Sequence, residues 1–124
     1  MTEKQIANAI ERFFRINGAD ELAFDTIVAS GPNSSMPHAV PTDRKIEYGD
    51  VITIDMGCKY NGYCSDMTRT IVMGKATDKQ KEIYNIVLEA QLKVIEEAKA
   101  NMSGIELDNI ARQYIIDKGY GDKL

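Results

Sequence analysis

Hydrophobic residues at the start of the chain recur with the spacing of a helix. Apolar side chains occupy positions 6, 9, 10, 13 and 14, which form one face of a helix with 3.6 residues per turn. Thr2 and Gln5 precede this stripe with the spacing of a capping box, in which each side chain bonds to the other residue's backbone N–H. Asn17 and Gly18 supply a helix stop. The pattern therefore predicts a helix that begins after Thr2 and runs to this stop.

Two further segments near the end of the chain have the same kind of start. Each opens with a hydroxyl residue followed three positions later by Gln or Glu, and each then carries apolar residues at helical spacing. The first of these helices is predicted to start at Thr77 and to end near Asn101. The second is predicted to start at Ser103, where Glu106 completes the capping pattern, and to end at Gly119.

The hydrophobic period changes between the first helix and the second. Residues 24–29, 51–60 and 63–73 are rich in β-branched and aromatic side chains and are predicted to be strands. All three prolines fall within residues 30–49, so this stretch is predicted to be a long structured loop, of the kind that often carries function. The expected fold class is α+β, in the order helix, strand, loop, β-hairpin, helix, helix.

Asn61 and Gly62 stand between the last two predicted strands and are a strong signal for a tight hairpin. Both central residues of a type I′ turn need a positive φ, which Asn and Gly tolerate best. If Tyr60 faces Tyr63 across this turn, then counting back along both strands pairs Asp55 with Thr68. A slip of one residue would send every side chain to the other face.

In this register, Asp55 and Asp66 lie on one face of the hairpin as diagonal neighbours. Diagonal Cβ atoms are roughly 7–8 Å apart or somewhat closer. Two carboxylates at that separation can reach a shared pair of divalent cations set about 3.5–4 Å apart. Asp is also disfavoured in strands, so two in one hairpin call for an explanation. The alternative is that both are solvated residues on an exposed sheet face.

His38 is the only histidine, and it lies in the long loop between Pro37 and Ala39. The simpler interpretation is an ordinary surface residue. A single histidine does not build the nitrogen-rich cluster typical of zinc, so a metal site here would depend mainly on oxygen ligands. The sequence shows no local signature of Ser-His-Asp or Cys-His catalysis and no nucleotide-binding glycine loop.

Length and composition indicate one ordinary globular domain. The chain has 124 residues, of which 44% are hydrophobic and 27% charged. Its formal net charge of −4 provides no electrostatic footprint for nucleic acid or for anionic lipid. We find no apolar run long enough to cross a membrane and no signal-peptide core, so a cytoplasmic location is expected. Cys58 and Cys64 are expected to be reduced, because the hairpin register puts them on opposite faces.

The sequence ITIDMG at residues 52–57, with GYCSDMTRT at residues 62–70, resembles the Xaa-Pro peptidase branch of the pita-bread metallopeptidases, which includes aminopeptidase P and prolidase. The similarity extends over nearly the whole chain. FDTIVASGPNSSMPHAVPTDRKIEYGD at residues 24–50 resembles the family's substrate-side strand and loop, and MTEKQIA at the start of the chain resembles the start of the family's second helix. Within this fold family, CSDMTRT favours the proline-directed branch over methionine aminopeptidase and creatinase.

The resemblance implies a fold in which two similar halves curve around a dinuclear metal centre held by two Asp, one His and two Glu. Asp55 and Asp66 match the two Asp ligands, Asp55 as a chelating ligand of one ion and Asp66 as a bridge between both. His38 resembles the loop histidine that contacts the substrate near the scissile bond. The implied cofactors are two divalent ions, Mn²⁺ foremost, with Co²⁺ or Zn²⁺ as alternatives.

The activity implied by the resemblance is that of a metal-dependent exopeptidase. It would hydrolyse the Xaa-Pro bond at a peptide N-terminus, as an Xaa-Pro aminopeptidase or dipeptidase, and its substrate would be a peptide with proline in the second position. The other three ligands are expected after KGYGDKL, so residues 1–124 are expected to be the truncated N-terminal half of a catalytic domain, inactive alone and weak in metal binding. Exposed sheet edges and apolar helix faces then favour a homo-oligomer.

A second hypothesis from another functional class stays open at this stage. Some relatives of this fold have lost their metal ligands and bind protein partners, so a non-catalytic pita-bread binding module is the alternative to an enzyme. The presence of Asp55, Asp66 and His38 favours the enzyme.

Overall fold

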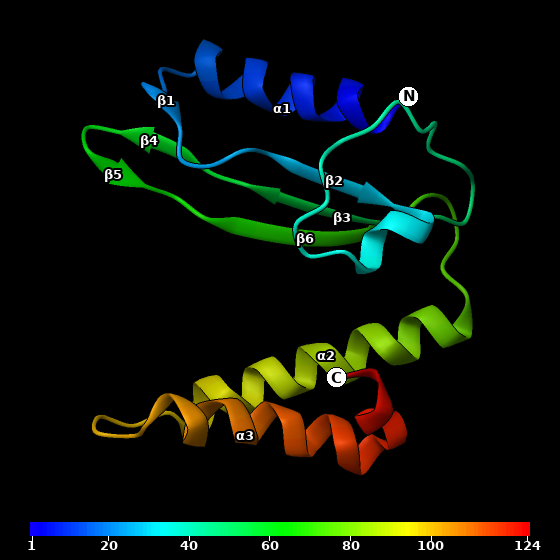
Figure 1. Ribbon diagram of the computed structural model, residues 1–124, viewed down its shortest axis with the longest axis vertical. Coiled ribbons are helices and arrows are strands. Elements are labelled where there is room, and N and C mark those ends of the chain that lie inside the picture. Colours follow the sequence, from blue (N-terminus) through cyan, green and yellow to red (C-terminus); the bar gives the residue numbers. More distant parts are fainter. The chain divides into compact units, whose positions relative to one another are not determined.

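The computed structural model describes all 124 residues and consists of two compact units, Met1–Ala76 and Thr77–Leu124. The first unit begins with a helix and continues with short strands (Figure 1). Its elements in chain order are α1 (Glu3–Ile16), β1 (Glu21–Leu22), β2 (Ile27–Ser30), a 3-10 helix (Gly31–Ser35), β3 (Val51–Met56), β4 (Cys58–Tyr60), β5 (Tyr63–Cys64) and β6 (Met67–Val72).

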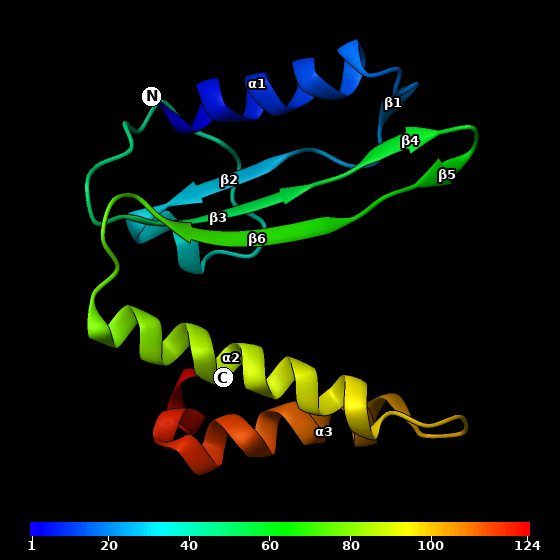
Figure 2. The same cartoon turned by 180° about the vertical axis from the view of Figure 1, so that it is seen from behind.

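The strands of the first unit form two antiparallel sheets, which Figure 2 shows from behind. The strand order is β2-β3-β6 in one sheet and β1-β4-β5 in the other. One long hairpin contributes to both sheets, because β3 leads into β4 and β5 leads into β6. Asn61 has a φ of 51° and Gly62 a φ of 83°, as a type I′ turn requires. Tyr60 pairs with Tyr63 and Asp55 with Thr68, so the predicted register is confirmed.

The prediction of two uninterrupted hairpin strands is wrong at Gly57 and Ser65. Ser65 N donates to the Cys58 carbonyl oxygen at 2.9 Å, but Cys58 N donates to the Ser65 hydroxyl at 3.0 Å. The Ser65 carbonyl oxygen approaches Gly57 so closely that a Cβ atom there would lie 2.1 Å from it. Only glycine fits this approach, and the break separates one sheet from the other.

Two other strand boundaries differ from the prediction. β2 begins at Ile27 and includes Ser30, whereas the pattern predicted residues 24–29. The two-residue strand β1 was not predicted, because it is too short to show any alternation. The long loop predicted at residues 30–49 is confirmed as a connection, but it covers residues 31–50 between β2 and β3, and it opens with a 3-10 helix that has Pro32 in its first turn.

Helix α1 packs against β2 through part of its predicted stripe (Figure 1). The Thr2–Gln5 capping box is present in full, with Gln5 N donating to Thr2 Oγ1 and Thr2 N donating to Gln5 Oε1. The hydrophobic cluster that joins the helix to the sheet has three buried residues, Ala7, Val28 and Ile52, with Ile6, Ile10, Ile46 and Ile54 partly buried around them. A buried Val or Ile side chain contributes roughly 1.5–3 kcal/mol, so this small core is enough to dock the helix. The end of the stripe is not buried, since Phe13 remains 65% exposed.

The second unit is a pair of helices, α2 (Asp78–Glu97) and α3 (Gly104–Ile115). Helix α2 has the complete capping box at Thr77 but ends at Glu97, earlier than predicted, because the following backbone is extended. At α3, Ser103 accepts from Glu106 N, while the reciprocal side-chain bond of the predicted box is not formed. A turn at Ile116–Tyr120 holds Gly119 at a φ of 90°, which is the predicted stop. Neither helix is both long and apolar enough to cross a membrane.

Candidate functional site

Asp55 lies in the centre of the β2-β3-β6 sheet, on the middle strand. It pairs with Ile27 on one side and with Thr68 on the other, so its backbone position is fixed from both directions. Its Oδ1 atom is buried and has no hydrogen-bond partner in the structure. Buried polar atoms in proteins are nearly always bonded, and a carboxylate oxygen without a partner is costly. A hard cation is the ligand that such an oxygen suits best.

Asp66 lies just before β6, two residues from the Thr68 that pairs with Asp55. Its side chain is exposed. Regular pairing resumes only at Met67, after the break at Ser65, so the ladder itself does not fix the side on which Asp66 projects. The prediction that Asp55 and Asp66 point into one pocket therefore stays a prediction. The chain contains no group of three or more His, Cys, Asp or Glu side chains placed to hold a metal ion.

His38 lies at an exposed position in the long loop. It belongs to a turn in which Ala39 N donates to the Met36 carbonyl oxygen at 3.3 Å. The structure does not bring His38 into a three-residue ligand cluster with Asp55 and Asp66. Its role in contacting a substrate stays a prediction.

Glu3, at the first position of α1, is the functional candidate that the sequence analysis missed. Its side chain is 0% exposed, and its two oxygens accept hydrogen bonds from Ser30, Asn33 and Thr42. Burial alone would raise the pKa of the Glu3 carboxyl, but the bonds from Ser30 and Thr42 outweigh it and lower the pKa to about 2. In the sequence, a Glu at this position is only a favourable charge at a helix N-terminus, and nothing signals a buried carboxylate.

An ion pair between Arg44 and Asp50 adjoins the Glu3 cluster. Arg44 Nη1 lies 2.7 Å from Asp50 Oδ2 and Nη2 lies 3.1 Å from Oδ1, a two-point contact that fits a guanidinium to a carboxylate. Arg44 Nη1 also donates to Ser30 Oγ at 2.7 Å. The hydrogen bond from Arg44 lowers the pKa of the Asp50 carboxyl, and the same bond raises the pKa of Arg44. Gly31 leaves room for this pair, because a Cβ atom there would lie 2.7 Å from Arg44 Nη2.

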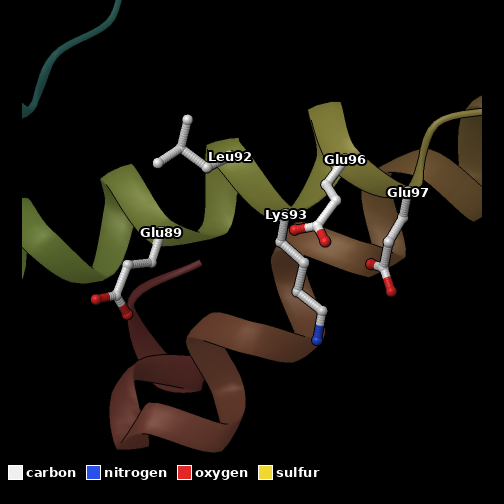
Figure 3. Close-up of a pocket in the computed structure, with 5 residues that line it drawn as sticks. All are labelled: Glu89, Leu92, Lys93, Glu96 and Glu97. Atoms are coloured by element: carbon white, nitrogen blue, oxygen red, sulfur yellow. The ribbon is translucent and has the colours of Figure 1, made fainter.

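Two surface pockets of the chain contain no predicted site residue. One lies at the hairpin tip between Tyr60 and Ser65, and the other lies on α2 (Figure 3). The α2 pocket is lined by Glu89, Leu92, Lys93, Glu96 and Glu97. Two of these side chains contact α3: Glu89 accepts a hydrogen bond from the Tyr114 hydroxyl, and Lys93 Nζ lies 5.7 Å from the centre of the Tyr114 ring. This pocket therefore belongs to the packing of the helix pair.

Comparison with known proteins places this geometry in a family. The chain is 52% identical over 120 residues to an Xaa-Pro dipeptidase from Pyrococcus furiosus, over 97% of this chain and 34% of that protein. The structure of the prolidase from Pyrococcus furiosus matches with a TM-score of 0.93 at 52% identity, over 98% of this chain and 36% of that one. The structure of an X-Pro aminopeptidase from Thermotoga maritima matches with a TM-score of 0.95 at 49% identity, over 98% of this chain and 35% of that one.

The chain thus spans about a third of the length of these relatives. Its mixed helix and sheet architecture is the corresponding part of the pita-bread fold, as the sequence predicted. A model of metallopeptidase family M24 matches residues 1–124, the whole of the chain. On this evidence the chain belongs to metallopeptidase family M24.

Proposed function

We propose that this chain is the N-terminal half of the catalytic domain of a metal-dependent exopeptidase that hydrolyses the Xaa-Pro bond at a peptide N-terminus. The observation that carries the proposal is the buried, unpartnered Oδ1 of Asp55 in the centre of a sheet. The relatives named Xaa-Pro dipeptidase, prolidase and X-Pro aminopeptidase support the proline-directed substrate, a peptide with proline in the second position.

Asp55 and Asp66 are the residues of this chain that would hold the metal. Both offer carboxylate oxygens, and Asp55 Oδ1, which has no hydrogen-bond partner, is free to bind a cation. We propose two divalent ions, Mn²⁺ in preference to Co²⁺ or Zn²⁺, with the remaining ligands outside residues 1–124. When bound, such a pair of ions supplies a water nucleophile at neutral pH and polarises the scissile carbonyl.

The chain's own contribution is to orient these groups. Asp55 is held between β2 and β6, and its buried oxygen gives up no hydrogen bond when a cation arrives. A ligand held this way loses little conformational entropy on binding. His38 would donate an imidazole N–H to the substrate or to the oxyanion that forms at the attacked carbonyl.

The proposed activity is tested on the full-length protein that contains this chain. With added Mn²⁺, it should hydrolyse Xaa-Pro peptides faster than matched Xaa-Ala peptides, and Asp55→Ala and Asp66→Ala should each abolish turnover. Asp25→Ala, at an exposed position of the same unit, is the control and should keep full activity. Equal rates on both peptides would refute the specificity, and turnover without Asp55 or Asp66 would refute their roles. No peptidase activity in the metal-loaded protein would favour the non-catalytic binding module.

The isolated chain should be inactive and should bind Mn²⁺ weakly, because two carboxylates leave each ion mostly hydrated. Its unpaired sheet edge and exposed apolar side chains should also make it self-associate. Isothermal titration with Mn²⁺ measures the first property, and sedimentation velocity measures the second. A monomer with tight binding of two ions would contradict this division of the site.

A further inference from the structure

The two oxygens of the buried Glu3 carboxylate bind opposite flanks of the loop that carries His38. Oε2 accepts from Ser30 N at 2.7 Å, from Ser30 Oγ at 2.6 Å and from Asn33 Nδ2 at 3.2 Å. Oε1 accepts from Thr42 N at 3.0 Å and from Thr42 Oγ1 at 2.6 Å. One side chain therefore joins the residues before the loop apex, residues 34–41, to those after it.

The backbone of α1 and the Arg44 side chain strengthen the same junction. Glu3 N donates to the Arg44 carbonyl oxygen at 3.0 Å, and Lys4 N donates to the Thr42 carbonyl oxygen at 3.1 Å. These are N–H groups in the first turn of α1, which have no partner within the helix. Arg44 in turn donates to Ser30 Oγ, on the flank where β2 ends. The helix start and both flanks of the loop thus form one polar cluster.

The chemistry of this cluster indicates a role beyond holding the fold together. A buried charge is often no more stabilising than a well-packed apolar residue of similar volume, so stability alone does not account for a charged residue at this position. The two carboxylate oxygens of Glu3 accept hydrogen bonds from five donors, so any shift of either flank breaks a hydrogen bond to a desolvated carboxylate. A carboxylate that binds both flanks therefore fixes their separation closely.

We propose that Glu3 is a positioning residue that holds the His38 segment in register with β2 and β3. The loop geometry stands on the contacts above. The catalytic consequence, that Glu3 acts through His38, rests on the proposed function. In that case, loss of Glu3 lowers turnover because the imidazole is misplaced, although Glu3 itself touches no substrate.

Amide hydrogen exchange on the full-length protein that contains this chain tests the geometry. Ser30 N and Thr42 N both donate to the Glu3 carboxylate, so Glu3→Gln should weaken their protection at least about tenfold more than that of amides in β3. Thr42→Val, which removes only one hydroxyl donor, is the milder variant and should affect Thr42 more than Ser30. Glu11→Gln, on the same helix and outside the cluster, should change neither. Unchanged relative protection in both Glu3→Gln and Thr42→Val would overturn the proposal.

A double-mutant cycle on the full-length enzyme tests the route through His38. Glu3→Gln should lower kcat at least about tenfold in the parent but have little further effect in a His38→Ala background, because the group being positioned is gone. Glu11→Gln should leave kcat unchanged in both. An equal loss in the two backgrounds would show that Glu3 only stabilises the fold. If the metal-loaded full-length protein hydrolyses no Xaa-Pro peptide, the proposed function fails, while the exchange experiment still decides whether Glu3 fixes the loop.

Discussion

The Glu3 carboxylate should make the stability of the first unit depend on pH in a way that Glu3→Gln removes. In the folded chain the pKa of Glu3 is about 2, against an ordinary value of 4.5. The lowered pKa corresponds to about 3 kcal/mol of stability, which is fully present above pH 4.5 and is lost as the pH falls toward 2. At pH 3 about 2 kcal/mol of this should already be gone. The neutral amide of Gln has no such titration.

Urea unfolding at pH 7, 5, 4 and 3, followed by circular dichroism, measures the free energy of unfolding of the unsubstituted protein and of the Glu3→Gln variant. Glu3→Gln should be less stable by about 3 kcal/mol or more at pH 7, because its amide also turns a donor toward other donors. The gap should stay constant down to about pH 5 and shrink by about 2 kcal/mol at pH 3. Arg44 and Asp50 face the same cluster, but both are present in the two proteins, so their contributions cancel. A gap that does not change with pH would refute the reasoning.

Two further predictions concern the hairpin break and the helix pair. Gly57→Ala should lower the free energy of unfolding by about 2 kcal/mol, because the added methyl would lie 2.1 Å from the Ser65 carbonyl oxygen. Gly104→Ala is the control, since a Cβ atom at Gly104 would have no atom within 4 Å. Equal urea midpoints for the two variants would contradict the close approach at Gly57. The hydrogen bond to the Glu89 carboxylate raises the pKa of the Tyr114 hydroxyl. Glu89→Gln should therefore bring this pKa down toward its ordinary value, as measured by a ¹³C NMR titration of the tyrosine rings. An unchanged pKa would show that the bond does not form in solution.

Local rules were enough to predict most of the secondary structure. The capping boxes at Thr2 and Thr77 and the turn at Asn61-Gly62 depend on residues within a few positions of one another, and the structure contains all three. The break at Gly57 depends on a close approach by Ser65 from the other strand. Strand propensity describes each segment by itself, so it predicted residues 51–60 and 63–73 as single strands, although the contact between Gly57 and Ser65 interrupts both.

The candidate site could be predicted only in part, because some of its contacts also join residues that are far apart in the sequence. Asp55 stood out because an acidic residue is unusual in a central strand, and the hairpin register gave its neighbours. Glu3 did not stand out, since its partners lie 27, 30 and 39 residues further along the chain. A buried carboxylate and a helix-capping charge look alike in a sequence until the distant donors are brought to it.

Because the loop is closed at its base, the stability of the sheet depends little on the length of the loop apex. Residues 34–41 leave and return between Asn33 and Thr42, two points that Glu3 already holds together. Each doubling of a flexible segment between fixed ends costs only about 0.6 kcal/mol in closure entropy. Insertions or deletions beside His38 should therefore leave β2 and β3 undisturbed. The apex of this loop can therefore change in length and sequence, through evolution or protein engineering, as long as its anchored base is kept.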